Sequence, residues 1–296
     1  MQQYPGQQFT GLLGVLTILA LGVLLSTNRR AINRRTIVVG VAVQFAIAYL
    51  FTQFPPVVAI FNTFAAGVTK VISFADEGTK FIFGNAADAS GPWGFIFAVK
   101  VLPIIIFFAA LMSVLYHIGL MQRVVAVLAS GLRRAMGISG AEALSAASNI
   151  FLGQTEAPLT VKPFIASMTR SQIMCIMVGG FATIAGSVMA AYIVLIGGDD
   201  DGARIEVAKH FMTASVMSAP AGIVMAKLML PETEDHPDES IDALKSMPRT
   251  TSNVMDAAAE GASDGLRLAL NVAAMLVAFV ALIAMLNWPL AALSEV

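Results

Sequence analysis

A carboxamide, a hydroxyl and a carboxylate follow one another within a mostly apolar stretch of this sequence. Gln154, Thr155 and Glu156 are consecutive, and Asn149 lies five residues before the first of them. A charged side chain at the centre of a bilayer costs at least about 2.5 kcal/mol on insertion scales. An acidic residue within a membrane segment therefore indicates a functional site, and the adjacent amide and hydroxyl groups can hydrogen-bond a polar small molecule.

The length of the surrounding segment predicts how these residues are positioned. Residues 139–169 lie between Arg133 and Arg134 on one side and Arg170 on the other, and arginine-rich short loops are expected in the cytoplasm. Two full membrane crossings would need roughly 40 residues plus a turn, which is more than the 31 residues available. We therefore predict a re-entrant helical hairpin, whose arms of about 14 residues each rise about 21 Å and pass the midplane without crossing.

Gly153 and Pro158 interrupt the middle of this segment and predict its tip. Proline is tolerated in the first turn of a helix, so Pro158 would begin the second arm and leave free backbone amides beside Glu156. Irregular backbone at membrane depth requires burial in protein or a cavity, and discontinuous helices at the midplane form the binding sites of secondary transporters. The alternatives are a tip that reaches cytoplasmic water and a structural ion pair between Glu156 and Lys162.

A second interruption falls in residues 173–196, an apolar run long enough to cross a membrane. Residues 179–187 contain three glycines and two hydroxyl side chains, so we predict local unwinding there. Unwinding would release backbone carbonyls, and hard cations such as sodium prefer oxygen ligands. Close helix packing through small residues is the alternative. The predicted cation shell consists of the side chains of Asn149 and Thr183 and the carbonyls of Leu152 and Ile184.

The composition agrees with a protein that lies in a membrane. Hydrophobic residues make up 57% of the chain and charged residues 12%, whereas soluble domains carry about 25% charged residues. Only helices and closed barrels satisfy their backbone within lipid, and the continuous apolar runs favour helices over a barrel. The net charge of -1 argues against a nucleic-acid partner. The predicted fold class is an all-α integral membrane protein.

Apolar runs and arginine positions predict the topology of this multi-pass protein. Four arginines follow the first run and assign that loop to the cytoplasm, so the N-terminus is expected outside, with the chain in the plasma membrane, here a bacterial inner membrane. About six transmembrane helices are predicted, at residues 9–26, 36–54, 93–116, 173–196, 207–230 and 268–286.

Amphipathic helices on the membrane surface are predicted between these spans. Residues 57–90 combine apolar residues at helical spacing with charged ones, among them Lys70, Asp76, Glu77 and Lys80, and are expected along the outer surface. Residues 121–136 are expected to form a basic amphipathic helix on the cytoplasmic side. Residues 254–266 are expected to form a short interfacial helix after the cytoplasmic polar loop at 231–253.

Four short runs resemble the concentrative nucleoside transporter family. They are GQTEAPL at 153–159, ATIAGSV at 182–188, NVMDAAA at 253–259 and NVAAML at 271–276. The resemblance covers nearly the whole chain. It implies a homotrimer in the membrane lipid, in which each protomer combines a scaffold with a moving transport part.

The resemblance also assigns roles to the residues singled out above. It implies that Gln154, Thr155 and Glu156 bind the nucleoside, with Val188 lining the pocket, and that the cation shell formed by Asn149, Leu152, Thr183 and Ile184 holds the coupling sodium ion. The scaffold would comprise residues 1–136 and 254–296, and the transport part residues 137–230 with the hairpin, the broken span 173–196 and the span 207–230.

The predicted function is sodium:nucleoside symport by alternating access. The family continues beyond its sixth span with a second hairpin and two more helices, which are expected to be absent from a chain that stops at residue 296. The alternatives are a truncated, non-transporting membrane fragment and proton-coupled nucleoside uptake. An intramembrane hydrolase acting through Glu156 would need a second carboxylate, a Cys/His pair or a metal cluster nearby, so we predict that the protein is not an enzyme.

Overall fold

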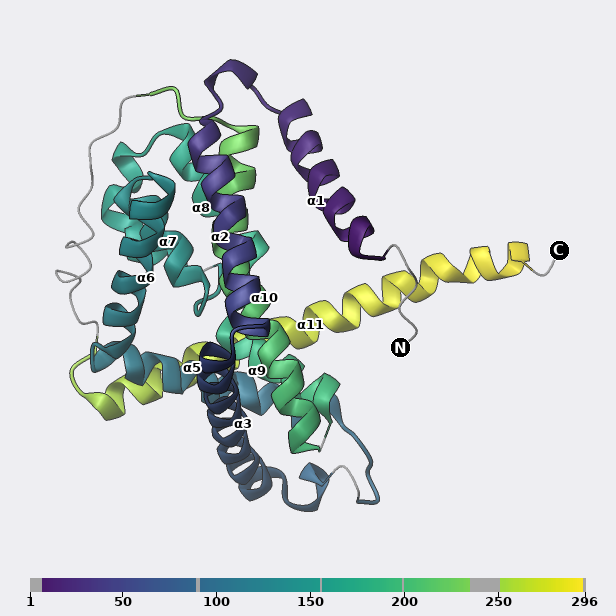
Figure 1. Ribbon diagram of the computed structural model, residues 1–296. Coiled ribbons are helices and arrows are strands. Elements are labelled where there is room, and N and C mark those ends of the chain that lie inside the picture. Colours follow the sequence, from purple (N-terminus) through teal and green to yellow (C-terminus); the bar gives the residue numbers. More distant parts are fainter. Residues whose placement is uncertain (1–6, 89–90, 155, 199, 235–250, 295–296) are drawn as a thin grey trace. The chain divides into compact units, whose positions relative to one another are not determined.

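The computed structural model describes residues 7–88, 91–154, 156–198, 200–234 and 251–294, and every regular element in these ranges is a helix (Figure 1). The predicted all-α fold class is confirmed. The elements are α1 (Gln7–Leu24), η1 (Arg29–Ala31), α2 (Arg34–Thr52), α3 (Pro55–Phe83), η2 (Gly84–Ala87), α4 (Phe97–Lys100), α5 (Leu102–His117), α6 (Leu120–Met136), α7 (Gly140–Asn149), η3 (Ala157–Ser167), α8 (Arg170–Ala182), α9 (Gly186–Gly197), α10 (Asp201–Met229) and α11 (Val254–Ser294).

Six helical stretches among the described residues are long and apolar enough to cross a membrane. They are Arg34–Thr52, Pro55–Ala87, Phe97–His117, Arg170–Gly197, Asp201–Met229 and Val254–Pro289. The number agrees with the prediction, but the set differs. The first predicted span is a shorter apolar helix, Thr10–Leu24, and the segment predicted as interfacial at 57–90 is the 29-residue helix α3. Its charged residues begin only at Lys70, which leaves an uncharged first half.

The chain folds into two compact units, which we describe separately. Unit 1 comprises residues 1–61, 121–186 and 209–248, and unit 2 comprises residues 62–120, 187–208 and 249–296. The hairpin segment therefore belongs to unit 1.

The core of unit 1 is built around α7, all ten residues of which are buried. Leu144 of α7 joins Ile176 of α8 and Ile223 of α10 in one apolar cluster. Helix α2 runs beside α10 (Figure 1), and a Cβ atom at Gly40 would lie only 2.3 Å from a Val224 methyl group. The absence of a side chain at Gly40 is thus what permits this close approach.

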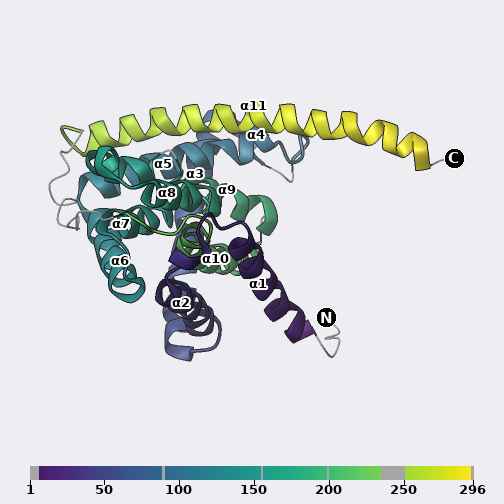
Figure 2. The ribbon, with the colours of Figure 1, turned by 90° about the horizontal axis from the view of Figure 1, so that it is seen from above.

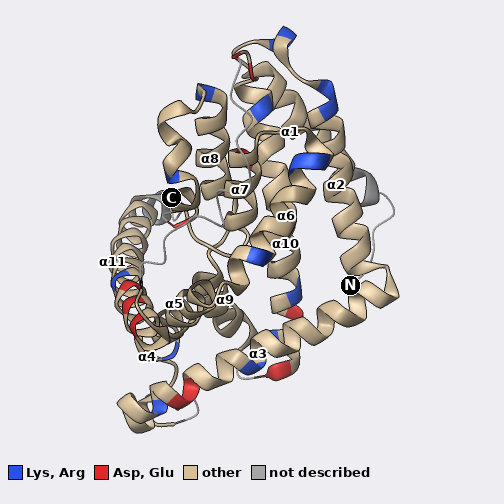
Figure 3. Cartoon of the chain, turned by 90° about the vertical axis from the view of Figure 1, so that its left-hand side faces the viewer, with Lys and Arg blue, Asp and Glu red and all other residues tan. Residues whose placement is uncertain are grey.

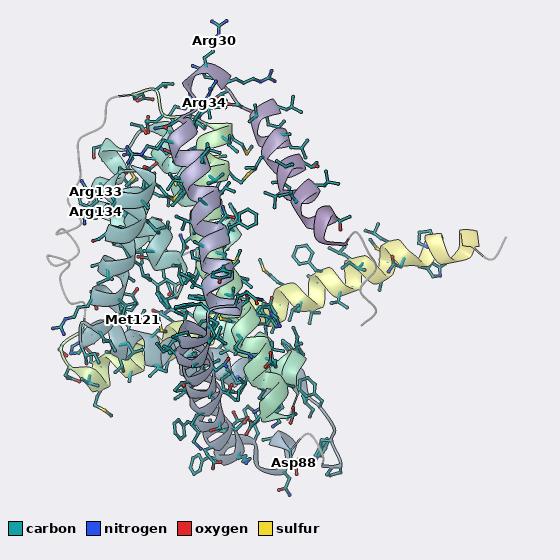
Figure 4. The ribbon with its side chains drawn as sticks, viewed as in Figure 1. Arg30, Arg34, Asp88, Met121, Arg133 and Arg134 are labelled. Carbon is teal, nitrogen blue, oxygen red and sulfur yellow. The ribbon has the colours of Figure 1, made fainter. Side chains whose placement is uncertain are left out.

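Several connections of unit 1 meet at one end and are tied together by hydrogen bonds. The Thr27 amide donates to the Met229 carbonyl at 2.9 Å, and the Thr36 hydroxyl donates to the Met136 carbonyl at 3.1 Å. Figure 4 places Arg133 and Arg134 at this end of α6, with Met121 at the other. Lys and Arg positions, blue on the chain in Figure 3, gather toward the end where α1 and α2 are joined. The arginines of these connections are Arg29, Arg30, Arg34, Arg35, Arg133, Arg134 and Arg170.

Unit 2 is dominated by the packing of α5 along α11 (Figure 2). Gly261 and Gly265, one turn apart on α11, face α5, and Cβ atoms there would lie 2.6 Å from the Ser113 Cβ and 2.8 Å from the Ile106 Cα. This is the small-residue spacing that brings two membrane helices into backbone contact. The separate interfacial helix expected at 254–266 and the span at 268–286 form one continuous helix, because no proline or loop residue separates them.

Unit 2 also buries an ion pair. Lys100 is 8% exposed, and its Nζ lies 3.8 Å from Oδ1 of Asp76, whose Oδ2 lies 3.9 Å from Arg204 Nη1. The lysine in the third apolar run is therefore paired within the protein and does not reach to the membrane surface.

Candidate functional site

The two arms of the predicted hairpin are α7 and η3, which pack against each other. A capping box starts α7, because the Ser139 hydroxyl accepts the Glu142 amide at 3.2 Å and the Glu142 carboxylate accepts the Ser139 amide at 3.0 Å. The arm ends at Asn149. The pair of packed arms is present as expected, and the depth of the tip in a bilayer stays a prediction.

The second arm is a 3₁₀ helix, which the sequence prediction did not distinguish from an α-helix. Pro163 lies inside it and has no amide to donate, and an α-helical turn there would press its ring against the Leu159 carbonyl. The residue before a proline also avoids the α conformation. The eleven residues of η3 therefore adopt the tighter helix, which rises about 2 Å per residue.

The tip between the arms is a hydrogen-bonded turn. The Gly153 carbonyl accepts the amides of Glu156 and Ala157 at 3.1 and 3.0 Å. The expectation of free amides beside Glu156 is therefore wrong for these two groups, because the turn at Gly153 uses them. Gln154 and Glu156 are exposed on this turn. Thr155 lies outside the described residues.

The predicted interruption of the fourth apolar run is confirmed. Helix α8 ends at Ala182, the backbone of Thr183 is extended, and α9 begins at Gly186. The break is shorter than the predicted 179–187. Gly179 and Gly180 remain helical, so for these two glycines the alternative of close packing is correct.

The hairpin tip and the broken helix are in direct contact. The Gly186 amide donates to the Phe151 carbonyl at 2.9 Å. A Cβ atom on Gly180 would lie 3.0 Å from the Gln154 Cβ, which is closer than side chains normally approach. The glycines of the broken helix thus let the backbone of the tip lie against it, and the two interruptions predicted from sequence form one site.

Asn149 is the most deeply buried polar residue of this site. It is 0% exposed, and both its amide nitrogen and its amide oxygen lack a hydrogen-bond partner among the described residues. A Cβ atom on Gly179 would lie 3.2 Å from its Nδ2. A buried carboxamide without a partner costs free energy, and the oxygen-rich chemistry of this corner suits a cation that would pair with it.

The other members of the predicted cation shell are Thr183, Leu152 and Ile184. The Thr183 hydroxyl donates to the Gly179 carbonyl at 2.9 Å, which leaves its oxygen lone pairs able to accept or to ligate an ion. Leu152 is buried and Ile184 is half-buried, beside the Gly186–Phe151 contact. Val188 lies in the first turn of α9 and belongs to unit 2.

Sequence reasoning missed one residue that holds the tip. The Ser215 hydroxyl, from the middle of α10, donates to the Ile150 carbonyl at 2.9 Å, just where α7 ends. It also missed the pairing of Lys227 with Glu142 at the base of the hairpin. An ionisable residue in an apolar helix was the available signal for Lys227, whereas no local pattern marks Ser215.

A glycine substitution tests the contact between tip and broken helix. A Cβ atom on Gly186 would lie 2.9 Å from the Phe151 carbonyl oxygen. We expect Gly186→Ala to destabilise the protein by about 1–3 kcal/mol, since the backbone must shift. Gly78→Ala, in the interior of α3 with nothing within 4 Å, is the matched control and should stabilise by about 0.5–1 kcal/mol. Thermal unfolding in detergent measures both, and equal stability of the two variants would contradict the contact.

Three protein-family models match consecutive parts of the chain. Residues 13–86 match a model described as Na+ dependent nucleoside transporter N-terminus, residues 98–199 one described as nucleoside recognition, and residues 210–296 the Na+ dependent nucleoside transporter C-terminus. The chain belongs to the Na+-dependent nucleoside transporter family. The family resemblance predicted from the four sequence runs is therefore confirmed, and the relatives of this protein are membrane transporters.

Individual members of this transporter family match almost the entire chain. An uncharacterized transporter of Haemophilus influenzae is 49% identical over 94% of this chain and 64% of its own length, and nucleoside permease NupC of Helicobacter pylori is 40% identical over 93% and 63%. Sodium/nucleoside cotransporter 2 of Rattus norvegicus is 37% identical over 98% of this chain and 42% of its own length. The chain thus spans less than two thirds of the length of these relatives.

The fold agrees with that of a solved family member. CNTnw in an inward-facing substrate-bound state superposes with a TM-score of 0.83 and 41% sequence identity, over 93% of this chain and 63% of that chain. Structures of CNTnw in outward-facing and intermediate states superpose equally well, with TM-scores of 0.82–0.84. The helical arrangement described above is therefore the family's arrangement.

Proposed function

We propose that this protein takes part in sodium:nucleoside symport by alternating access. The observation that carries the proposal is the contact of the hairpin tip with the broken helix α8–α9, where Asn149 is buried without a hydrogen-bond partner among the described residues. Paired discontinuous helices are the structural basis of substrate and ion sites in secondary transporters. The sodium/nucleoside cotransporters among the relatives support the choice of substrate and ion.

We assign one set of residues of the tip and the break to the nucleoside and another set to the sodium ion. Gln154, Thr155 and Glu156 bind the nucleoside, and Val188 lines its pocket. The sodium ion takes the Asn149 carboxamide oxygen, the Thr183 hydroxyl and the carbonyls of Leu152 and Ile184. Since the two sets share the tip, sodium binding orders the nucleoside ligands, and each ligand raises the affinity for the other.

The transport part is the hairpin with the broken helix and α10, and the scaffold is the remainder, as the family resemblance implies. The arginine-rich end of unit 1 faces the cytoplasm and the N-terminus lies outside, in a bacterial inner membrane. Protomers associate as a homotrimer. The chain acts as a transporter and not as an enzyme, and among its described residues no group of His, Cys, Asp and Glu is arranged to hold a metal.

Uptake of labelled uridine into vesicles containing the chain tests this function. We expect uptake to rise with an inward sodium gradient and to be unaffected by a protonophore. Uptake that follows a proton gradient instead would replace sodium by protons as the coupling ion.

Absence of uptake under both gradients would favour the second candidate, a truncated, non-transporting membrane fragment, against which stabilisation by uridine would count. Thermal unfolding with and without uridine then separates binding from inactivity, because a ligand of the folded state raises the midpoint.

A further inference from the structure

A buried cluster of charges lies at the base of the hairpin, outside the proposed substrate and sodium site. Lys227 of α10 is 7% exposed, and its Nζ lies 2.5 Å from Oε1 of Glu142 and 3.3 Å from Oε2 of Glu232. Glu142 is 1% exposed. The cluster therefore consists of one ammonium group shared by two carboxylates, with the shorter contact made to the deeper one.

The hydroxyl group of Ser171 is the third partner of the Lys227 ammonium group. Lys227 Nζ donates to the Ser171 hydroxyl at 3.0 Å, and that hydroxyl donates to the Leu230 carbonyl at 2.7 Å. Glu142, Glu232 and Ser171 thus use all three N–H groups of the ammonium. A lysine held by three partners has a fixed position, unlike a lysine that extends to the membrane surface.

Glu232, at the outer edge of the cluster, is held as a carboxylate. Burial alone would raise its pKa, but the hydrogen bond from Thr169, 2.8 Å away, and the charge of Lys227 outweigh burial and keep the pKa below its usual value. Glu232 also accepts the amides of Thr233 and Glu234. Glu232 therefore remains a carboxylate at neutral pH.

The partners of Lys227 come from the ends of three separate elements. Glu142 lies in the first turn of α7 and also closes its capping box. Thr169 is the N-cap of α8, Ser171 lies in its first turn, and Glu232 follows the end of α10. One side chain thus joins the base of the first hairpin arm to the start of the broken helix.

Helix α7 connects this charged cluster to the hairpin tip. The ten residues of α7 span about 15 Å, and Asn149 is the last of them. At the far end the backbone of Gly180 lies against the tip, because a Cβ atom there would be only 3.0 Å from the Gln154 Cβ. A small tilt of α7 at its base would therefore move the tip away from the broken helix.

We propose that Lys227 is a positioning residue, which locks the base of the hairpin to α8 and α10 and thereby holds the tip against the broken helix. It has no part in binding the nucleoside or the sodium ion. The proposal rests on contacts within unit 1 alone, so it stands independently of the proposed transport function. Removal of the ammonium group alone leaves Glu142 as a buried charge without its counter-charge, whereas neutralising both groups together is tolerated.

Hydrogen–deuterium exchange of the detergent-purified protein tests this positioning role. In Lys227→Met we expect the amides of Glu156, Ala157 and Gly186, whose acceptors are Gly153 and Phe151, to exchange about tenfold faster than in the wild type. Leu228→Ala is the matched control, because Leu228 is the adjacent buried residue of α10 and packs near Gly22. It should lower the unfolding midpoint without altering exchange at the tip.

The double variant Glu142→Gln/Lys227→Met keeps the test decisive if Lys227→Met alone does not fold. It removes the uncompensated charge together with the ammonium group, so the protein should fold while exchange at the tip stays about tenfold faster than in the wild type. Wild-type exchange at the tip in Lys227→Met, or an equal increase in Leu228→Ala, would overturn the proposal. If the wild-type protein binds no uridine, the proposed function is contradicted, but the conclusion from the exchange experiment still stands.

Discussion

We expect Glu156→Gln to raise the dissociation constant for uridine about a hundredfold. An ionised carboxylate accepts hydrogen bonds from ribose hydroxyl groups, and a hydrogen bond to a charged group contributes about 1.5–3 kcal/mol. Glutamine keeps the size of the side chain but loses the charge and one acceptor oxygen. Glu156 is exposed on the tip, so the substitution changes a surface group of the hairpin and leaves its buried core unaltered.

Equilibrium binding of labelled uridine to purified protein measures this effect. Lys162→Gln is the matched control, since Lys162 is an exposed charged residue on the same 3₁₀ arm and has no assigned role. Its dissociation constant should remain within about twofold of the wild type. Unchanged affinity in Glu156→Gln would remove this residue from the nucleoside site.

The geometry explains why two interrupted helices are needed. A continuous helix satisfies its own amides and carbonyls and offers a ligand only side chains. Here the break after Ala182 and the turn at Gly153 each open a helix, and each then supplies part of the other's hydrogen bonding, as the Gly186–Phe151 bond illustrates. What remains without a partner among the described residues is the carboxamide of Asn149.

Local patterns predicted the parts of the site that depend on local physics. The short span between flanking arginines predicted the hairpin, and the three glycines after Val178 predicted the break, because both features follow from backbone requirements within lipid. The family resemblance added the roles of Gln154 and Glu156. The hydrogen-bonded turn at Gly153 was missed, because free amides were inferred from Pro158 alone.

Features that depend on contacts between distant segments could not be predicted. Lys227 and Glu142 are 85 residues apart, and no local pattern reveals that their side chains meet. Residues 57–90 were predicted to lie along the membrane surface because charged residues accompany the apolar ones, whereas Pro55–Ala87 is long and apolar enough to cross a membrane. The continuity of α11 was missed because residues 254–266 and 268–286 were predicted as two separate helices, whereas one helix runs through both and packs on α5 at Gly261 and Gly265.

Asn149→Leu should raise the stability of the sodium-free protein and abolish the further stabilisation that sodium confers. Leucine has nearly the same shape as asparagine and removes two buried polar atoms that have no partner among the described residues. Relief of that desolvation cost, about 1–3 kcal/mol, raises the unfolding midpoint in sodium-free buffer. In sodium-containing buffer the variant gains no further stability, because the carboxamide oxygen that would ligate the ion is gone.

Thermal unfolding of wild type and variant, in sodium and in choline buffers, measures both effects in one experiment. The wild type should be stabilised by sodium and the variant should not, and uridine affinity in the variant should lose its sodium dependence through the shared tip. Ser148→Ala is the control, since Ser148 precedes Asn149 and is equally buried but donates its hydroxyl to Thr160. If Asn149→Leu lowers stability in both buffers, Asn149 has a structural role in place of an ion-binding one. If sodium stabilises the variant as much as the wild type, the ion binds elsewhere.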